Sequence, residues 1–165
     1  MDSVLGIDPG TATTGFGLIK ENNNGLELID YGIISTPPDL GMEKRLQIIY
    51  EEMLKLIDLH QPDSCAVEKL FFQRNVTTAI SVGQARGVVL LALAQKTVKF
   101  AEYTPLEVKQ AVTGYGVASK KQVQIMVQSI LNLSKIPKPD DASDALAVAI
   151  CHAHSKKISD LQYLP

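Results

Sequence analysis

VLGIDPGTATTGFG, residues 4–17, joins the pattern of a buried strand to a charged side chain at its end. The apolar and glycine residues before Pro9 are typical of a core strand, but the strand ends on Asp8. Pro9-Gly10 then predicts a turn into a second strand. Asp8 either caps this turn or has a chemical role, and the rest of the chain has to decide between them.

Length and composition indicate one globular domain without membrane segments. A chain of 165 residues suits a single domain. The longest apolar run, residues 88–94, is far shorter than the roughly 20 residues that span a bilayer. The N-terminus lacks the pattern of a secretory signal, so we expect a cytoplasmic location. Cys65 and Cys151 lie in apolar contexts without CxxC spacing, which predicts buried, reduced thiols.

Charge is distributed unevenly along the chain. The formal net charge is −2, yet residues 1–63 hold eleven acidic and four basic side chains, a net of −7, whereas residues 64–165 hold seven and twelve, a net of +5. This asymmetry is compatible with an anion-binding face, although solvated surface charge alone also produces it.

Strand and helix patterns predict an α/β fold. Strands are expected at residues 4–8, 15–19, 26–35, 64–68 and 98–103, and helices at residues 43–59 and 76–96, behind Thr104, behind Ser119 and from Asp140 onward. The first three strands follow one another closely and predict an antiparallel meander. Thr104 and Ser119 each begin a capping box, and Asp140 is the expected N-cap of the last helix.

The helix predicted at residues 76–96 carries small residues at every fourth position: Ala79, Gly83 and Gly87. Such a face allows close packing. Two interpretations stay open, a helix packed against the sheet and a helix packed against a partner subunit.

Four carboxylates form the strongest functional candidate. Asp8 and Glu68 each end a predicted strand, and Asp141 and Asp144, three residues apart, share one face of the last helix. Taken singly, each has a structural explanation, because strand ends cap turns and acidic residues in a first helical turn stabilise the helix dipole. Strand ends in α/β folds nevertheless converge on one edge, where sites form.

Carboxylates gathered at one edge would repel each other unless a cation neutralised them. A ligand set of oxygens without His or Cys favours Mg²⁺, with Mn²⁺ as a substitute, over Zn²⁺. Two such ions, about 3.5–4 Å apart, stabilise the attacking and leaving oxygens in phosphoryl transfer. We therefore expect Asp8 to be a metal ligand, with two ions bound during catalysis.

Five motifs, in this order and spacing, resemble the RuvC-type Holliday junction resolvases: GIDPGTATTGFG, AVEKLFFQRN, GQARG, VKQAVTGYGVASKKQVQ and DDASDALAVAICH. The resemblance covers essentially residues 1–165 and implies a single nuclease domain. It also implies a ribonuclease H-like fold, with a five-stranded mixed sheet flanked by helices.

The family resemblance implies an activity and partners. Its members are homodimeric, Mg²⁺-dependent endonucleases that cut four-way DNA junctions by paired nicks in recombination and repair, leaving 5′-phosphate and 3′-hydroxyl ends. A junction-binding branch-migration complex is the further partner. The motifs place the catalytic metal ligands at Asp8, Glu68, Asp141 and Asp144. Relatives have Asp or His at the position of Asp141, so this set is all carboxylate, and His152 and His154 are expected at the surface or helix end.

The resemblance also indicates DNA-binding residues. Phe71 matches the aromatic residue that stacks on bases near the crossover, whereas Phe72 is open to an inward orientation. Lys109 and Lys120 match basic positions of the family. Two further basic residues are plausible additions on charge and position: Arg74 and Lys121.

Three alternatives remain at this stage. The first motif also resembles the phosphate loop of actin-like sugar kinases and ATPases, but those proteins need a second such loop and a second domain. A nuclease family of the same fold, which trims ribosomal RNA precursors, is similar in the opening strand. A junction-binding module without enzymatic activity is the third, and the intact acidic set speaks against it.

Overall fold

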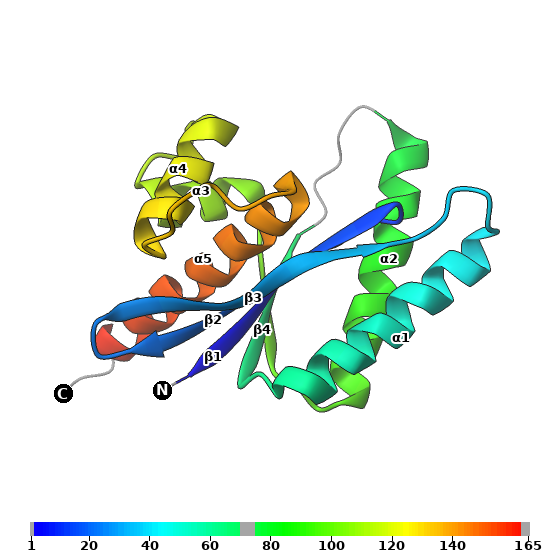
Figure 1. Cartoon of the computed structure of the whole chain (residues 1–165), viewed down its shortest axis with the longest axis horizontal. Coiled ribbons are helices and arrows are strands. Elements are labelled where there is room, and N and C mark those ends of the chain that lie inside the picture. The colour runs from blue at the N-terminus through cyan, green and yellow to red at the C-terminus, as the bar shows by residue number, and fades with distance from the viewer. Residues whose placement is uncertain (1, 70–74, 163–165) are drawn as a thin grey trace.

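A mixed five-stranded sheet forms the centre of the computed structural model, which describes the backbone of residues 2–69 and 75–162 and the side chains up to residue 156. The strands are β1 (Ser3–Asp8), β2 (Thr13–Asn22), β3 (Gly25–Ser35), β4 (Ser64–Glu68) and β5 (Phe100–Tyr103), in the order β3-β2-β1-β4-β5 (Figure 1). The first three strands pair antiparallel, and β4 and β5 are added in parallel. This confirms the predicted meander and mixed sheet, although β5 begins two residues later than expected and β2 is longer.

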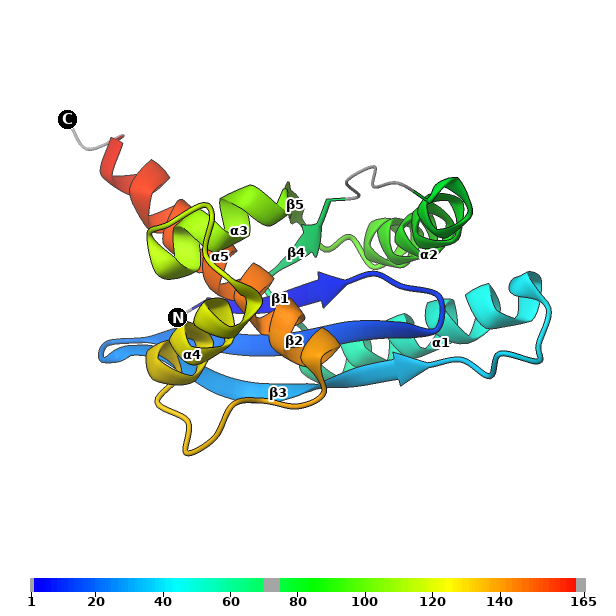
Figure 2. The same cartoon turned by 90° about the horizontal axis from the view of Figure 1, so that it is seen from above.

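Helices cover both faces of the sheet. They are α1 (Met42–His60), α2 (Val76–Gln95), α3 (Pro105–Thr113), α4 (Lys120–Ile130) and α5 (Asp140–Gln162). The first two lie on one face and the last three on the other (Figure 1, Figure 2). Both predicted capping boxes are present, at Thr104 and Ser119. Cys65 and Cys151 are free and buried, one in the core on each face, as predicted.

Successive side chains of β1 point alternately to the two faces of the sheet, each of which is covered by a layer of helices. Leu5 and Ile7 pack in the core with α1 and α2, whereas Val4 packs in the core with α5. Because successive side chains of a strand point to opposite faces, Gly6 and Asp8 lie on the same face as Val4. The strand therefore directs the Asp8 carboxylate toward α5.

Helix α5 lies directly on the backbone of β1 and β2, because glycines remove the side chains between them. A Cβ added to Gly6 would collide with the carbonyl oxygen of Ala145, and one added to Gly15 with that of Asp141. Gly15 is the cross-strand partner of Asp8. The contact therefore brings the start of α5 next to the end of β1.

Helix α2 packs on α1 through one side and exposes the other. Ala85 and Val89 contribute to the core, while a Cβ added to Gly87 would have no described atom within 4 Å. The interpretation that the small-residue face packs against the sheet is therefore wrong at Gly87, and packing against a partner subunit stays open. By length and composition α2 is also sufficient to cross a membrane, but Arg86 in its middle forms an ion pair with Glu102 of β5.

Candidate active site

Three carboxylates from two elements converge at one end of the sheet. Asp8 ends β1, and Asp141 and Asp144 lie at the start of α5. One oxygen of each lies within 4.8 Å of the others. The predicted convergence of strand end and helix face is thus present, and we call these three residues the acidic cluster.

Glu68 lies beside the acidic cluster, on the neighbouring strand. It ends β4, which runs parallel to β1, and its carboxyl group shares a hydrogen bond with that of Asp8. Burial raises the pKa of Asp8 to about 10, and the hydrogen bond to Glu68 and repulsion from Glu68, Asp144 and Asp141 add to the rise. The shift reflects crowded negative charge, which an oxygen-coordinated cation would relieve. The donor set therefore fits a hard divalent metal ion.

Lys120 supplies positive charge to this site. Its Nζ lies 3.3 Å from Oδ2 of Asp144 and 3.8 Å from Oδ2 of Asp140. Burial raises the pKa of Asp144, whereas Lys120 lowers it and repulsion from Glu68 and Asp141 adds to the rise. Partial burial opposes charge on Lys120, but the Asp144 and Asp140 carboxylates raise its pKa overall.

Thr13 contacts the acidic cluster, and its role was not predicted from the sequence. Its hydroxyl donates a hydrogen bond to Oδ2 of Asp141 at 2.6 Å. Thr13 begins β2, two residues before Gly15, over which the start of α5 lies. The sequence shows only that Thr13 carries a hydroxyl five residues after Asp8. Its hydrogen-bond partner depends on where α5 packs, which the sequence does not show.

Asp140 does not have the predicted role of N-cap. It is the first residue of α5, and its Oδ1 accepts hydrogen bonds from Gln124 at 3.1 Å and Lys138 at 3.4 Å. These partners lower the pKa of Asp140, the bond to Lys138 most strongly. Asp140 therefore links α4 to α5 beside the acidic cluster.

Two of the predicted DNA-binding lysines border the site. Lys109 and Lys120 line a hollow of about 220 Å³ together with Glu68 and Asp144. Lys121 is exposed at the next position of α4. The remaining two predicted residues, Phe71 and Arg74, lie outside the described residues.

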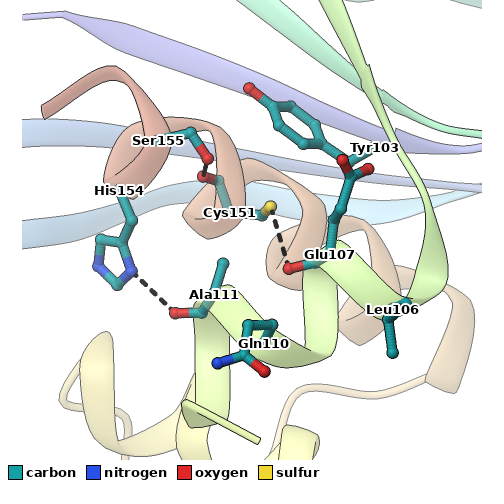
Figure 3. Close-up of a pocket in the computed structure, with 8 residues that line it drawn as sticks. All are labelled: Tyr103, Leu106, Glu107, Gln110, Ala111, Cys151, His154 and Ser155. Carbon is teal, nitrogen blue, oxygen red and sulfur yellow. Dashed lines mark hydrogen bonds between the residues drawn. The ribbon is translucent and has the colours of Figure 1, made fainter. Parts of the chain in front are cut away.

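The two histidines of α5, expected at the surface or helix end, lie away from the acidic cluster and are partly exposed, each with hydrogen-bond partners. His152 is half-buried, and its ring contacts the hydroxyl of Tyr103 at 2.8 Å and that of Ser64 at 3.1 Å. Nδ1 of His154 lies 3.2 Å from the carbonyl oxygen of Ala111 (Figure 3). Tyr103 and His154 line a cavity of about 750 Å³ between α3 and α5, to which none of the four carboxylates contributes.

Comparisons with known proteins identify the family. A family model described as crossover junction endodeoxyribonuclease RuvC matches residues 4–152. The enzyme of that name from Halothermothrix orenii is 56% identical over 156 residues, 94% of each chain. The structure of T. thermophilus RuvC in complex with Holliday junction substrate has a TM-score of 0.91 at 34% identity, covering 96% of this chain and 97% of that one.

A more distant structure supports the fold alone. The yeast mitochondrial Holliday junction resolvase Ydc2 is 15% identical, with a TM-score of 0.68 over 98% of this chain and 86% of that one. These likenesses confirm the ribonuclease H-like fold with its mixed five-stranded sheet. The family match spans residues 4–152 and includes all three members of the acidic cluster as well as Glu68. This chain therefore belongs to the RuvC family of crossover junction endodeoxyribonucleases.

Proposed function

We propose that residues 1–165 act as one Mg²⁺-dependent nuclease domain that resolves four-way DNA junctions, with Mn²⁺ as a substitute metal. The observation that carries the proposal is the convergence of Asp8, Asp141 and Asp144 within 4.8 Å, with the Glu68 carboxyl group next to that of Asp8. The proposed substrate is supported by the T. thermophilus relative, whose structure contains a Holliday junction substrate.

The proposed reaction is hydrolysis of a phosphodiester. A water oxygen attacks the phosphorus in line, the bond to the 3′-oxygen breaks, and that oxygen takes up a proton, which leaves a 5′-phosphate and a 3′-hydroxyl. Asp8, Glu68, Asp141 and Asp144 would hold two metal ions, which supply Lewis-acid stabilisation of the attacking and leaving oxygens. Thr13 holds the Asp141 carboxylate in place through its hydrogen bond.

DNA binding is assigned to residues around the same hollow. Lys109 and Lys120 line it with Glu68, so a phosphate that reaches them lies near the acidic cluster. Lys121 adds charge at the first turn of α4, where free backbone N–H groups favour phosphate. The motif match assigns base stacking to Phe71, and Arg74 is added as a phosphate contact because of its charge and its position in the sequence.

Paired nicks call for two equal sites, and a two-fold homodimer supplies them. Helix α2 offers an exposed apolar face for this contact: Val76 is 73% exposed, and Ile80 and Leu91 are each 58% exposed. Gly87 lies between them without a described neighbour, so a second backbone can approach there. A cytoplasmic location and a junction-binding branch-migration complex as partner complete the proposal.

The deciding experiment compares three substrates at equal concentration: a synthetic four-way DNA junction, a linear duplex of the same sequence and a structured RNA. We expect symmetric nicks in the junction only, with Mg²⁺ or Mn²⁺ and not in excess EDTA. Ca²⁺ has looser coordination geometry and should allow junction binding with little cleavage. Preferential RNA cleavage would favour the ribosomal RNA processing alternative, and junction binding without cleavage would favour a binding module.

A further inference from the structure

The acidic cluster is already in contact with a cation that belongs to the protein. Lys120 is the first residue of α4, and its ammonium group donates a hydrogen bond to Oδ2 of Asp144. Among the ion pairs of the described residues, this is the one that includes a member of the acidic cluster. One potential metal-ligand oxygen is therefore occupied by a lysine.

The contact between Lys120 and Asp144 is easily broken. The Lys120 side chain is 57% exposed and that of Asp144 is 28% exposed, so water can replace either partner. The N–O distance of 3.3 Å exceeds the roughly 2.7–2.9 Å of a strong charge-assisted hydrogen bond. Exposed pairs of this kind contribute little to stability because solvent screens them and the side chains lose freedom.

A divalent cation and the Lys120 ammonium cannot share Asp144 at low cost. A magnesium ligand oxygen lies about 2.0–2.1 Å from the ion, so an ion on Asp144 would be a near neighbour of the ammonium group. Two positive charges at that separation repel each other. A metal ion on the cluster would therefore weaken the contact between Lys120 and Asp144.

The surroundings of Lys120 give it a second anion to bind. It lines the hollow that also includes Lys109 and Glu68, on the side where the proposed function places a DNA phosphate. Its long flexible side chain starts in the first turn of α4 behind the Ser119 cap. Movement from Asp144 to a phosphate requires rotation of this one side chain.

We propose that Lys120 is an exchangeable counter-ion of the acidic cluster: it occupies Asp144 until a divalent cation binds, and it then pairs with a DNA phosphate. The inference rests on the proposed metal-dependent function. Because such a coupling is reciprocal, metal binding strengthens DNA binding and DNA binding strengthens metal binding to the same extent. Lys120 thus delays full metal loading until DNA is present.

The test is a titration of the full chain with Mn²⁺ in the absence of DNA. The electron paramagnetic resonance signal of free Mn²⁺ measures how much of the metal is bound at each concentration. Removal of the competing charge in Lys120→Met should tighten Mn²⁺ binding by about tenfold, whereas Lys120→Arg keeps the charge and should stay close to wild type. Lys138→Met is the matched control, because Lys138 pairs with Asp140 outside the acidic cluster. It should change the affinity by less than about twofold.

Coupling is measured on the same proteins as the gain in junction affinity when Ca²⁺ is added. Wild type should show a larger gain than Lys120→Met. If Lys120→Met has the wild-type melting temperature and binds Mn²⁺ no more tightly than wild type, the inference is wrong while the metal site stands. If wild type binds no Mn²⁺, the inference and the proposed metal-dependent function both fail.

Discussion

Thr13 and Asp141 are joined by a 2.6 Å hydrogen bond although 128 residues separate them in the sequence. The bond connects the first residue of β2 to the start of α5, the two elements that meet at Gly15. The donor hydroxyl restricts the rotation of the Asp141 carboxylate and leaves its second oxygen for other contacts. Thr13 is therefore a positioning residue for the acidic cluster.

Thr13→Val keeps the shape of the side chain and removes this donor. We expect junction cleavage to slow by about 10- to 100-fold and the Mg²⁺ concentration for half-maximal rate to rise, as is usual when a partner of a metal ligand is lost. Single-turnover cleavage over a Mg²⁺ series measures both effects. Thr13→Ser retains the hydroxyl and should restore most of the rate. A wild-type Mg²⁺ dependence in Thr13→Val would contradict this role.

Asp8→Asn separates catalysis from folding and binding. The high pKa of Asp8, caused mainly by burial, means that the group is neutral in the metal-free protein near pH 7, and Asn imitates that state. We expect an unchanged melting temperature in EDTA and junction binding as tight as that of wild type, because Asn and the neutral carboxyl group carry the same charge. Cleavage should fall by several orders of magnitude, since metal stabilisation of the transition state is lost.

The measurements for Asp8→Asn are gel-shift affinity and single-turnover cleavage of one junction. Asp141→Asn should behave in the same way. Asp140→Asn is the control, since Asp140 bonds to Gln124 and Lys138 rather than joining the acidic cluster. Cleavage by Asp8→Asn at the wild-type rate, or loss of its fold, would make Asp8 a structural residue.

Protonation of His152 should reduce the stability of the folded protein in mild acid. Burial, together with the nearby Lys156, lowers the pKa of His152 below its ordinary value near 6.5. The unfolded chain then binds the proton more readily than the folded one, so stability is fully present above about pH 6.5 and declines as the pH falls through the folded pKa. From pH 7.5 to 5 the melting temperature of wild type should fall relative to that of His152→Gln, a difference in which the opposite effect of the raised Asp8 pKa cancels. Parallel curves for the two proteins would exclude this origin.

Leu91→Glu tests the proposed dimer face on α2. Wild type should behave as two chains in light scattering at micromolar concentration, and a charge on the exposed apolar face should produce a monomer. Leu59→Glu introduces the same charge at a residue of α1 that is 74% exposed, and it should leave the dimer intact. A wild-type monomer that still cuts junctions would refute the symmetric arrangement.

Phe71→Ala tests base stacking, which follows from the motif alone. A stacking contact contributes about 1–3 kcal/mol, so junction cleavage should fall by about tenfold or more at an unchanged melting temperature. Phe72→Ala is the neighbouring control and should have the smaller effect on cleavage. A large drop in the melting temperature of Phe71→Ala would instead identify a core residue.

The sequence predicted the strands and the four carboxylates because those signals are local. An apolar run that ends on an acid marks both β1 and β4, and three-residue spacing places Asp141 and Asp144 on one face. The partners of these carboxylates were not predictable. Thr13 and Lys120 find theirs only because α5 packs across β2 and next to α4.

The close contacts between helix and sheet lie at Gly6 and Gly15, which the sequence analysis did not single out. Gly87 of α2 has no described neighbour within 4 Å, which leaves packing against a partner subunit as the open interpretation of that helix face. Glycines in strands signal close approach only when the covering helix is known. The contacts of His152 were missed for a similar reason, because Tyr103 and Ser64 come from β5 and β4.

The backbone contact between α5 and the glycines of β1 and β2 has an engineering consequence. Since main chain rests on main chain at Gly6 and Gly15, the spacing between Asp8 and Asp141 is a fixed dimension of the scaffold. A changed side chain in either hydrophobic core acts on stability through cavities or overpacking, whereas a side chain at Gly6 or Gly15 would push α5 off the sheet. Redesign for thermostability should therefore keep these two glycines and the volume of both cores.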